Sequence, residues 1–484
     1  MDSKGDAQRN RTIQNQIRSK YGVTVHDTMS NSTKEIPSDA VRIYLCGVTV
    51  YDDTHIGHAR TIIHFDVFRR HLESMGYKVT LIQNFTDIDD KILQRADKEG
   101  IPYTTLTDKY IKRYHEDFNR LHVRQADAYP RATAHIDDIQ SMISGLLDTG
   151  HAYRTKSGIY YRIGSFPEYG KLSGKDTEGL LSGARVEPRG DKSDPMDFAL
   201  WKNVDVKPYW NSPWGNGKPG WHIECSAMSL KYLGEEFEIH GGGRDLIFPH
   251  HENEIAQSEG YTSKRQAQIW MHTGMVTISG QKMSKSLGNI KSTRTLLDVW
   301  GPNVIRLFCL SGHYRKPLDY SDYLLNESLT LWRRLEIAHF TLEQCADDNI
   351  TQKQSTRRDE FDASLAADMN THQAIKHMME LTREAGTAIA SGAIDSQDAG
   401  LMYADLRYMT DILGLEVQRP NDITVQNVVK SIEQRQKMRQ KGAYEKADAI
   451  RDSLSCQGVE LLDYPVKTLW VYHETISGES IPDR

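Results

Sequence analysis

The sequence predicts an α/β protein: a parallel-sheet domain with a mixed insertion, followed by a mainly helical C-terminal half. Two observations predict the sheet. Residues 41–46 and 77–85 are apolar enough for strands, and a helical pattern lies between them. This alternation of strand and helix is typical of a parallel sheet. From about residue 286 to about residue 454 the helical period dominates, which predicts the helical half.

The first helix is predicted from the spacing of apolar residues. After His55 they recur at steps of three and four, and Gly76 ends the face that they form. This face consists of Ile62, Phe65, Phe68, Leu72 and Met75. A further helix is expected to open at residues 86–90, because acidic residues there occupy a first turn, where the helix dipole favours them.

Length and composition limit the class of protein. At about 100–200 residues per domain, 484 residues predict two to four domains. Five cysteines are too sparse for a disulfide framework and fit a reducing cytoplasm. No apolar run approaches the ~20 residues of a membrane span, and no apolar segment follows the N-terminus as a secretory signal. We therefore expect a cytoplasmic protein without membrane contact. The net charge of -6 neither predicts nor excludes a nucleic-acid partner.

Changes in composition divide the chain into five parts. Residues 1–40 are polar and are expected to form a flexible extension. The α/β domain is expected over 41–300, with an insertion at about 130–219 where Gly, Pro, Ser and Tyr become frequent. The rest divides into helical regions at 301–355 and 356–420 and a small C-terminal region at 421–484, whose last segment has short apolar runs suited to one or two strands.

The segment His55-Ile56-Gly57-His58 lies where a strand turns into a helix. Open α/β sheets bind ligands at such turns, and a helix N-terminus offers backbone N–H groups to phosphate. Gly57 has no Cβ, so a nucleotide can lie against the backbone. The two imidazoles fall on one face of the first turn and can donate to phosphate oxygens. Alone, the pattern fits equally well two histidines that cap the helix or are solvated.

A second candidate segment is Lys282-Met283-Ser284-Lys285-Ser286. Two lysines flank small hydroxyl residues on what is expected to be a loop. Lys285 is a compact cation suited to the charge that builds on a transferred or leaving phosphate. The alternative is a solvated basic surface loop.

A third group of residues suggests a metal site. His250 and Glu254 are four residues apart on one face of a helix that Pro249 can begin. With the thiolates of Cys46 and Cys225 they make a plausible four-coordinate zinc set. His251 with Glu254 is also geometrically possible, and the spacing does not decide between the two histidines. The alternative is a pair of core cysteines and a polar helix start.

The His55–His58 and Lys282–Ser286 segments together resemble the HIGH and KMSKS motifs of class I aminoacyl-tRNA synthetases, in order and in position. The resemblance implies a Rossmann-type catalytic domain. It also implies that an amino-acid carboxylate reacts with ATP, with Mg²⁺, to give an aminoacyl-adenylate and pyrophosphate before transfer to tRNA. It assigns His55, Gly57, His58 and Lys285 to ATP binding, and Lys282 and Lys285 to stabilising the transition state.

Four further segments resemble cysteinyl-tRNA synthetases: Cys46–Asp52, Asn84–Lys91, Gly220–Met228 and Gly241–Gln257. The resemblance implies one zinc ion per chain, bound by Cys46, Cys225, His250 and Glu254, with the substrate thiol on the zinc. It places Thr86, Trp221 and Asp245 in the amino-acid pocket. Serine differs from cysteine by one atom, which an apolar pocket separates poorly, whereas zinc prefers a soft thiolate.

The C-terminal region carries a candidate RNA contact. Basic residues crowd 431–452 around Tyr444, a combination suited to phosphate contact and base stacking. A solvated helix face is the alternative. The resemblance assigns Arg439, Tyr444 and Asp448 to the anticodon, with Tyr444 where Trp is frequent, so any stacking should be weaker. It makes 301–355 a stem-contact region, 356–420 a tRNA-binding bundle and 421–484 an anticodon-binding region.

The resemblance implies a ligase that activates L-cysteine with ATP and transfers it to the 3′ end of cysteine tRNA; we expect a monomer. One alternative is a ligase that joins cysteine to an amino sugar, which should end soon after the catalytic domain, whereas a long segment follows Pro317 here. A second is a non-catalytic RNA-binding paralogue. Such proteins usually lose motif residues, but both histidines and both lysines of the motifs are present.

Overall fold

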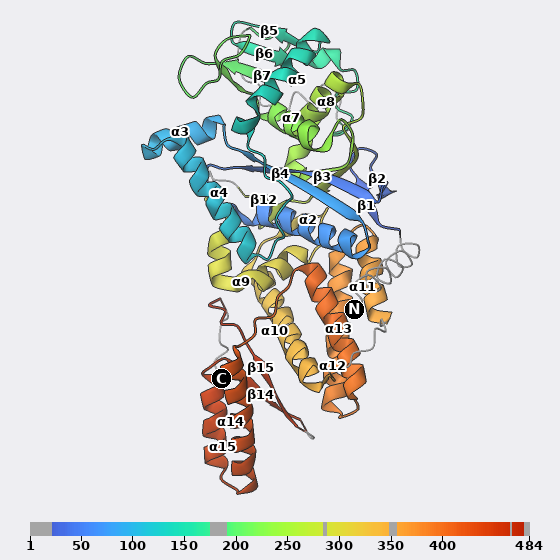
Figure 1. Ribbon diagram of the computed structural model, residues 1–484, viewed down its shortest axis with the longest axis vertical. Helices are drawn as coiled ribbons and strands as arrows, with labels where there is room; N and C mark the ends of the chain where they lie inside the picture. The colour runs from blue at the N-terminus through green and yellow to red at the C-terminus, as the bar shows by residue number, and fades with distance from the viewer. Residues whose placement is uncertain (1–21, 175–190, 284–287, 348–355, 465–466, 479–484) are drawn as a thin grey trace, which may run out of the picture.

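The computed structural model describes residues 22–174, 191–283, 288–347, 356–464 and 467–478. Figure 1 shows them along one long axis: a small antiparallel sheet at the top, a parallel sheet in the middle and helices below. The parallel sheet has the strand order β10-β9-β3-β4, which confirms the predicted α/β class. Its strands are β3 (Ala40–Thr49), β4 (Lys78–Thr86), β9 (Phe237–Gly243) and β10 (Ala267–Thr273).

Alternation along β3 explains why helices cover both faces of this sheet. Val41, Ile43 and Leu45 are buried in one apolar cluster with residues of α2 (Ile56–Ser74). Tyr44 and Cys46 point to the other face, into a cluster with residues of α7 (Trp221–Leu233). Successive side chains of a strand point to opposite sides, so β3 contributes to two cores at once.

The insertion is mixed, as predicted. It opens with η1 (Ala132–His135) and α5 (Ile136–Asp148) and continues into an antiparallel sheet with the strand order β5-β6-β7-β8. Its elements are β5 (Ala152–Arg154), β6 (Gly158–Tyr161), η2 (Ile163–Ser165), β7 (Phe198–Asn203) and β8 (Gly217–Pro219). The chain then returns to the main sheet through α7, which leads into β9. The connection from β9 to β10 contains η3 (Arg244–Leu246), the π-helical turn η4 (Ile247–His251) and α8 (Glu252–Thr262).

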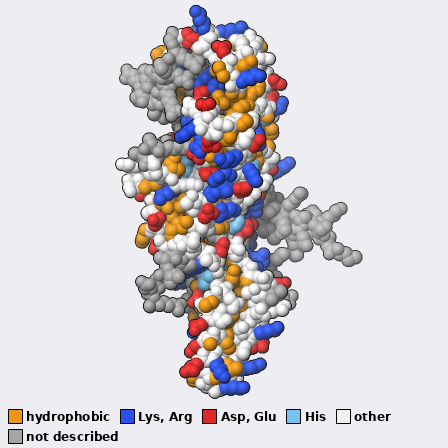
Figure 2. Space-filling model, turned by 90° about the vertical axis from the view of Figure 1, so that its left-hand side faces the viewer, with side chains coloured by type: hydrophobic (Ala, Val, Ile, Leu, Met, Phe, Trp, Pro, Cys, Tyr) orange, Lys and Arg blue, Asp and Glu red, His pale blue; other side chains and the backbone are white. Residues whose placement is uncertain are grey.

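Two helices follow β4: α3 (Asp90–Glu99) and α4 (Tyr103–Arg120). The second of them connects the segments that lie next to the two predicted nucleotide-binding motifs. Arg113 Nε on α4 lies 2.6 Å from Asp53 Oδ1, just before the His55 turn. Arg294 Nη2 at the start of α9 lies 2.7 Å from Glu116 Oε2 on α4. Figure 2 shows Lys and Arg side chains gathered near the middle of the long axis, with acidic side chains among them. The helix α4 therefore ties the HIGH turn to the helix that follows the KMSKS segment.

Below the sheet the structure is almost entirely helical, as predicted from the helical period after residue 286. The connection contains β11 (Val276–Ile278), β12 (Gln281–Lys282), α9 (Thr293–Leu310) and β13 (Leu318–Asp319). The helices that follow are α10 (Asp322–Cys345), α11 (Thr356–Ala366), α12 (Thr371–Ala390), α13 (Ser396–Leu413), α14 (Asp422–Gln440) and α15 (Tyr444–Ser455). The predicted terminal strands are β14 (Val459–Asp463) and β15 (Thr468–Tyr472), which pair antiparallel.

The prediction that residues 1–40 form a flexible extension is wrong for the part that the structure describes. β1 (Thr24–Asp27) and β2 (Ser32–Glu35) form a hairpin before Val41. Val23 and Val25 are fully buried, and the backbone N–H of Thr28 donates to the carbonyl of Trp270. Two valines and hydrogen bonds to the neighbouring strand order this polar segment.

Among the residues that the structure describes, no helix is both long and apolar enough to cross a bilayer. This agrees with the absence of an apolar run of membrane-spanning length from the sequence.

A charged histidine fastens the C-terminal strands to α10. His473 Nδ1 lies 3.0 Å from Glu336 Oε2 on α10, and Nε2 lies 3.1 Å from Glu460 Oε2 on β14. Burial alone would lower the pKa of His473, but hydrogen bonds to the two carboxylates outweigh it and raise this pKa to about 9. Both ring nitrogens donate, so the protonated ring is the one that fits.

The raised pKa of His473 predicts a pH-dependent contribution to stability. Because the folded pKa lies above the unfolded value of about 6.5, the stabilisation is complete below pH 6.5 and is lost as the pH rises through about 9. Replacing His473 with Gln should therefore lower the thermal midpoint more at pH 6 than at pH 10. A His372→Gln variant serves as control, since that ring contacts a carbonyl, that of Ser311. An equal loss at both pH values would contradict the assignment.

Candidate active site

The HIGH segment forms the N-terminus of α2. His55 is the N-cap, and its Nδ1 accepts hydrogen bonds from the backbone N–H of Gly57 at 3.2 Å and of His58 at 3.4 Å. In return the backbone N–H of His55 donates to His58 Nδ1 at 3.3 Å. The two rings stack with centroids 3.7 Å apart. The histidines therefore cap the helix and also form a shaped pair at its positive end.

This capping arrangement fixes the protonation of both rings. Each Nδ1 accepts a backbone N–H, so in the neutral ring the hydrogen is on Nε2. Burial, together with the neighbouring His55, holds the pKa of His58 well below its ordinary value, so this ring is neutral at pH 7. A neutral pair of Nε2–H donors at a helix N-terminus is suited to phosphate oxygens.

The start of the KMSKS segment lies beside the HIGH turn. A Cβ added at Gly57 would lie 3.6 Å from the Met283 side chain, which follows β12. After the segment, the backbone N–H of Ile56 donates to the carbonyl of Lys291, and that of Thr293 donates to the carbonyl of Thr54. Lys282 ends β12, and Lys285 lies outside the described residues. The described start of the KMSKS segment is thus a neighbour of the HIGH turn in space, although more than 220 residues separate the two in sequence.

The four predicted metal ligands converge. Cys46 comes from β3, Cys225 from α7, and His250 and Glu254 from the helical segment after β9. Each offers one ligand atom, and these atoms all lie within 4.8 Å of one another. His250 Nε2 lies 3.0 Å from Glu254 Oε1, which is the contact expected of residues four apart on a helix. Phe248 is extended, so helical backbone begins at Pro249 as predicted.

Burial and charge make this cluster suited to a cation. Burial raises the pKa of Glu254 and of Cys46 well above their ordinary values. A hydrogen bond from Cys46 lowers the pKa of Cys225 to about 7. Glu254 Oε2 accepts no hydrogen bond from the described residues, although it is buried. A divalent ion would compensate the thiolate and carboxylate charges that burial otherwise disfavours, and the two sulfurs, imidazole and carboxylate suit zinc.

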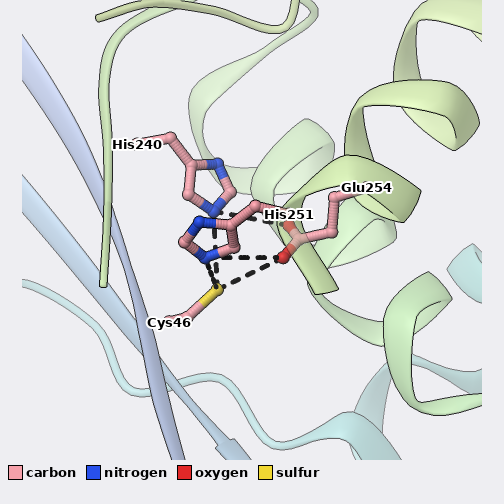
Figure 3. A group of neighbouring side chains, drawn as sticks. All are labelled: Cys46, His240, His251 and Glu254. Atoms are coloured by element: carbon pink, nitrogen blue, oxygen red, sulfur yellow. Dashed lines mark hydrogen bonds and ion pairs between the residues drawn. The ribbon is translucent and has the colours of Figure 1, made fainter. Parts of the chain in front are cut away.

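A second donor set shares two of these ligands. His240 on β9 and His251 also lie with Cys46 and Glu254, with ligand atoms within 4.8 Å of one another. Figure 3 shows both rings turned toward the Cys46 sulfur, at 3.4 Å for His240 Nε2 and 3.3 Å for His251 Nε2. His251 was an open alternative from its spacing. His240 was missed, because only the pairing of β9 with β3 brings it opposite Tyr44.

Other histidines hold the two imidazole ligands in place. His222 Nδ1 lies 2.8 Å from His250 Nδ1, and His272 Nε2 lies 2.8 Å from His251 Nδ1. His272 in turn contacts the Thr28 hydroxyl of the β1–β2 hairpin at 2.8 Å. His250 and His251 therefore each have a partner on the second ring nitrogen, which orients the ring.

A close approach of two strands positions Cys46. The register of β3 against β4 shifts between Leu45 and Val48, and the backbone N–H of Gly47 donates to Asn84 Oδ1 at 2.9 Å. A Cβ at Gly47 would lie 1.6 Å from the Asn84 carbonyl oxygen, so only glycine fits. This irregularity, a β-bulge, sets the direction of the neighbouring thiol.

The predicted pocket residues differ in burial, and one of them, Trp221, contacts this cluster. Thr86 is buried at the end of β4, and its hydroxyl oxygen accepts from Asn84 Nδ2 at 3.5 Å. Trp221 begins α7, is 39% exposed, and stacks on His250 with ring centroids 4.2 Å apart. Asp245 lies on the exposed turn between β9 and α8. A buried end and an exposed rim are what a pocket open to a small molecule requires.

The three predicted anticodon residues lie far from this site, on the helical hairpin of α14 and α15 at the lower end of the molecule (Figure 1). Tyr444 begins α15 and is 64% exposed. Arg439 near the end of α14 lies 3.2 Å from Asp463 of β14, and Asp448 is exposed on α15. The Arg439 and Tyr444 positions are brought close by the short turn between the two helices.

Known protein families match both halves of the chain. Residues 32–330 match the family of tRNA synthetases class I (C) catalytic domains, and residues 360–418 match the DALR domain. The solved structure of Mycobacterium tuberculosis methionyl-tRNA synthetase in complex with methionyl-adenylate shares the fold. Its TM-score is 0.55 at 14% identity, over 77% of this chain and 89% of that chain. The fold and the paired motifs define a class I tRNA synthetase.

Curated relatives show which family of class I tRNA synthetases the chain resembles. The cysteine–tRNA ligase of Carboxydothermus hydrogenoformans is 44% identical over 460 residues, covering 92% of this chain and 99% of the relative. That of Aquifex aeolicus is 42% identical, covering 93% and 99%, and that of Thermococcus onnurineus is 41% identical, covering 93% and 98%. The chain belongs to the cysteine–tRNA ligase family.

Proposed function

We propose that this protein activates L-cysteine with ATP and transfers it to the 3′ end of cysteine tRNA. In the first step the cysteine carboxylate attacks the α-phosphorus of ATP, and the bond to pyrophosphate breaks. In the second, a hydroxyl of the terminal adenosine attacks the carbonyl carbon, and AMP leaves. The observation that carries the proposal is the buried cluster of two thiols, an imidazole and a carboxylate. One of its members, Cys46, lies on the strand that leads into the HIGH turn.

The residues at the turn have distinct proposed roles. His55 and His58 donate through Nε2 to the ATP phosphates, and Gly57 leaves room for the nucleotide beside the backbone. Lys282 and Lys285 compensate the charge that develops as pyrophosphate leaves, with Mg²⁺ on the phosphates. Thr86, Trp221 and Asp245 line the pocket that holds the amino acid.

We propose a zinc ion in the cluster, one per chain, held by Cys46, Cys225, His250 and Glu254. The donor chemistry supports this set over the one with His240 and His251, since two sulfurs favour zinc. When bound, zinc would favour the substrate thiolate over the hydroxyl of serine. Trp221, stacked on His250, would then keep water from one side of that ligand.

For the helical half we propose contact with tRNA. The stem-contact region is 301–355, the tRNA-binding bundle 356–420 and the anticodon-binding region 421–484. Arg439, Tyr444 and Asp448 read the anticodon from the α14–α15 hairpin, where an exposed ring can stack on an unpaired base. This half also favours tRNA over an amino sugar as the acceptor. We further propose a monomer acting in the cytoplasm, which agrees with five free cysteines.

Aminoacylation of cysteine tRNA tests the whole proposal. The purified protein should exchange pyrophosphate into ATP only with cysteine present, and should charge cysteine tRNA with cysteine but not serine. Exchange without charged tRNA would point to another acceptor, with an amino sugar as the first compound to try. Absence of both activities would leave an RNA-binding role only.

Metal content distinguishes the two donor sets. Freshly purified protein should contain about one zinc per chain by elemental analysis. Cys225→Ser should reduce this content strongly, whereas His240→Asn should leave it in place, because only the first belongs to the proposed set. The opposite pattern would move the ion to the second set. Full zinc content in both variants would contradict both assignments.

The anticodon contact predicts a separable effect of Tyr444. Loss of base stacking costs roughly 1–3 kcal/mol, so Tyr444→Ala should raise the KM for tRNA by about 5–150-fold. Cysteine-dependent pyrophosphate exchange should not change, because the ring lies far from the catalytic site (Figure 1). Tyr232→Ala, at an exposed tyrosine outside the proposed tRNA-contact regions, is the matched control. An unchanged KM for tRNA in the Tyr444 variant would remove this residue from the interface.

A further inference from the structure

Arg60 is a buried arginine on α2, two residues after His58, and its side chain is used by none of the roles above. It is 0% exposed and donates four hydrogen bonds, all to backbone carbonyls. Nη1 donates to Gly274 at 2.9 Å and to Met275 at 3.2 Å. Nη2 donates to His313 at 3.1 Å and to Lys316 at 2.7 Å. No carboxylate forms an ion pair with Arg60 within the described part of the chain.

The carbonyl groups that accept these hydrogen bonds belong to two segments that meet beside α2. Gly274 and Met275 connect β10 to β11, and β11 pairs with β12, which ends at Lys282. His313 and Lys316 belong to the connection between α9 and β13. A Cβ on Gly274 would lie 2.3 Å from the Lys316 carbonyl oxygen, so the two backbones touch there. The guanidinium of Arg60 therefore donates to carbonyl groups of both segments.

A second anchor, Asp319, holds the same hairpin near its turn. Asp319 of β13 accepts hydrogen bonds from the Thr277 hydroxyl at 2.7 Å and from the backbone N–H of Gly280 at 2.9 Å. Parallel pairing of β11 with β13 adds the bond from the Leu318 N–H to the Met275 carbonyl. The hairpin from Val276 to Lys282 is therefore fixed at its base by Arg60 and near its turn by Asp319.

We infer that Arg60 is a positioning residue for adenylate formation, which fixes the β11–β12 hairpin, and with it Lys282, against the HIGH turn. This rests on the proposed function, in which His55, His58 and Lys282 act on one nucleotide. Arg60 and His58 lie on the same helical turn. The helix α2 therefore carries the HIGH histidines and also holds the hairpin that ends at Lys282. An apolar side chain would remove the donor from the carbonyls of Gly274 and Lys316, for which Arg60 is the donor found among the described residues. A lysine has one nitrogen in place of the two that donate here.

Arg60→Lys tests the inference against Arg70→Lys as a matched control. Arg70 is also a buried arginine of α2, but it donates to Asp66 and to the carbonyls of Asp411 and His122, away from the hairpin. Arg60→Lys should lower kcat for cysteine-dependent pyrophosphate exchange by about 10²-fold, the scale expected of a small misplacement. The Kd for cysteine, measured by equilibrium dialysis, should stay unchanged. Arg70→Lys should slow exchange far less at equal loss of thermal stability.

Hydrogen–deuterium exchange gives a readout that does not need activity. Amides of residues 274–282 should exchange faster in Arg60→Lys and at the wild-type rate in Arg70→Lys. Should Arg60→Lys fail to fold, Asp319→Ala removes the other anchor at an exposed position and should slow pyrophosphate exchange as well. Equal slowing by the Arg60 and Arg70 variants, unchanged amide exchange in Arg60→Lys, or full activity of Asp319→Ala would overturn the inference. A wild-type protein without cysteine-dependent pyrophosphate exchange would instead refute the proposed function. Hydrogen–deuterium exchange would still test whether Arg60 holds the β11–β12 hairpin.

Discussion

The parallel pairing of β3 with β4 on one side and β9 on the other aligns the carboxyl ends of three strands at one edge of the sheet. Cys46, Thr86 and His240 stand near that edge because their strands run in the same direction. The chain leaves β3 at this edge and enters α2, so the HIGH turn lies there too. Shifting one strand along its neighbour would separate the candidate metal cluster from the nucleotide motif.

Local sequence patterns were enough to predict the parts of this site that depend on interactions between residues close in sequence. The stripe of apolar residues in α2, the turn at its start and the four-residue spacing of His250 and Glu254 depend on neighbours in sequence. Cys46 and Cys225 were plausible partners from their donor chemistry, and the resemblance to a family favoured them over the alternative of two core cysteines. The pairing of β9 with β3, which adds His240, involves residues about 200 positions apart and has no local signal.

Arg60 and the β1–β2 hairpin show a different limit of prediction. A charged residue on a helix suggests a solvated position, yet Arg60 is buried because carbonyls more than 200 residues away converge on it. The hairpin is polar in composition, which suggests disorder, yet its hydrogen bonds are completed by Trp270 and Asp368. In both places polar groups are satisfied by distant backbone or side chains, and composition carries no information about such partners.

The hairpin also bears on the order in which the chain can fold during synthesis. Its residues are made before their partners, since His26 and Thr24 bond to Asp368 and Ala366, 342 residues further on. Its neighbour Trp270 likewise emerges from the ribosome more than 240 residues later. At a few to about twenty residues per second, the segment waits for tens of seconds before its partners exist. Closing the N-terminal hairpin against both the sheet and the helical bundle is therefore among the late events in the maturation of the fold.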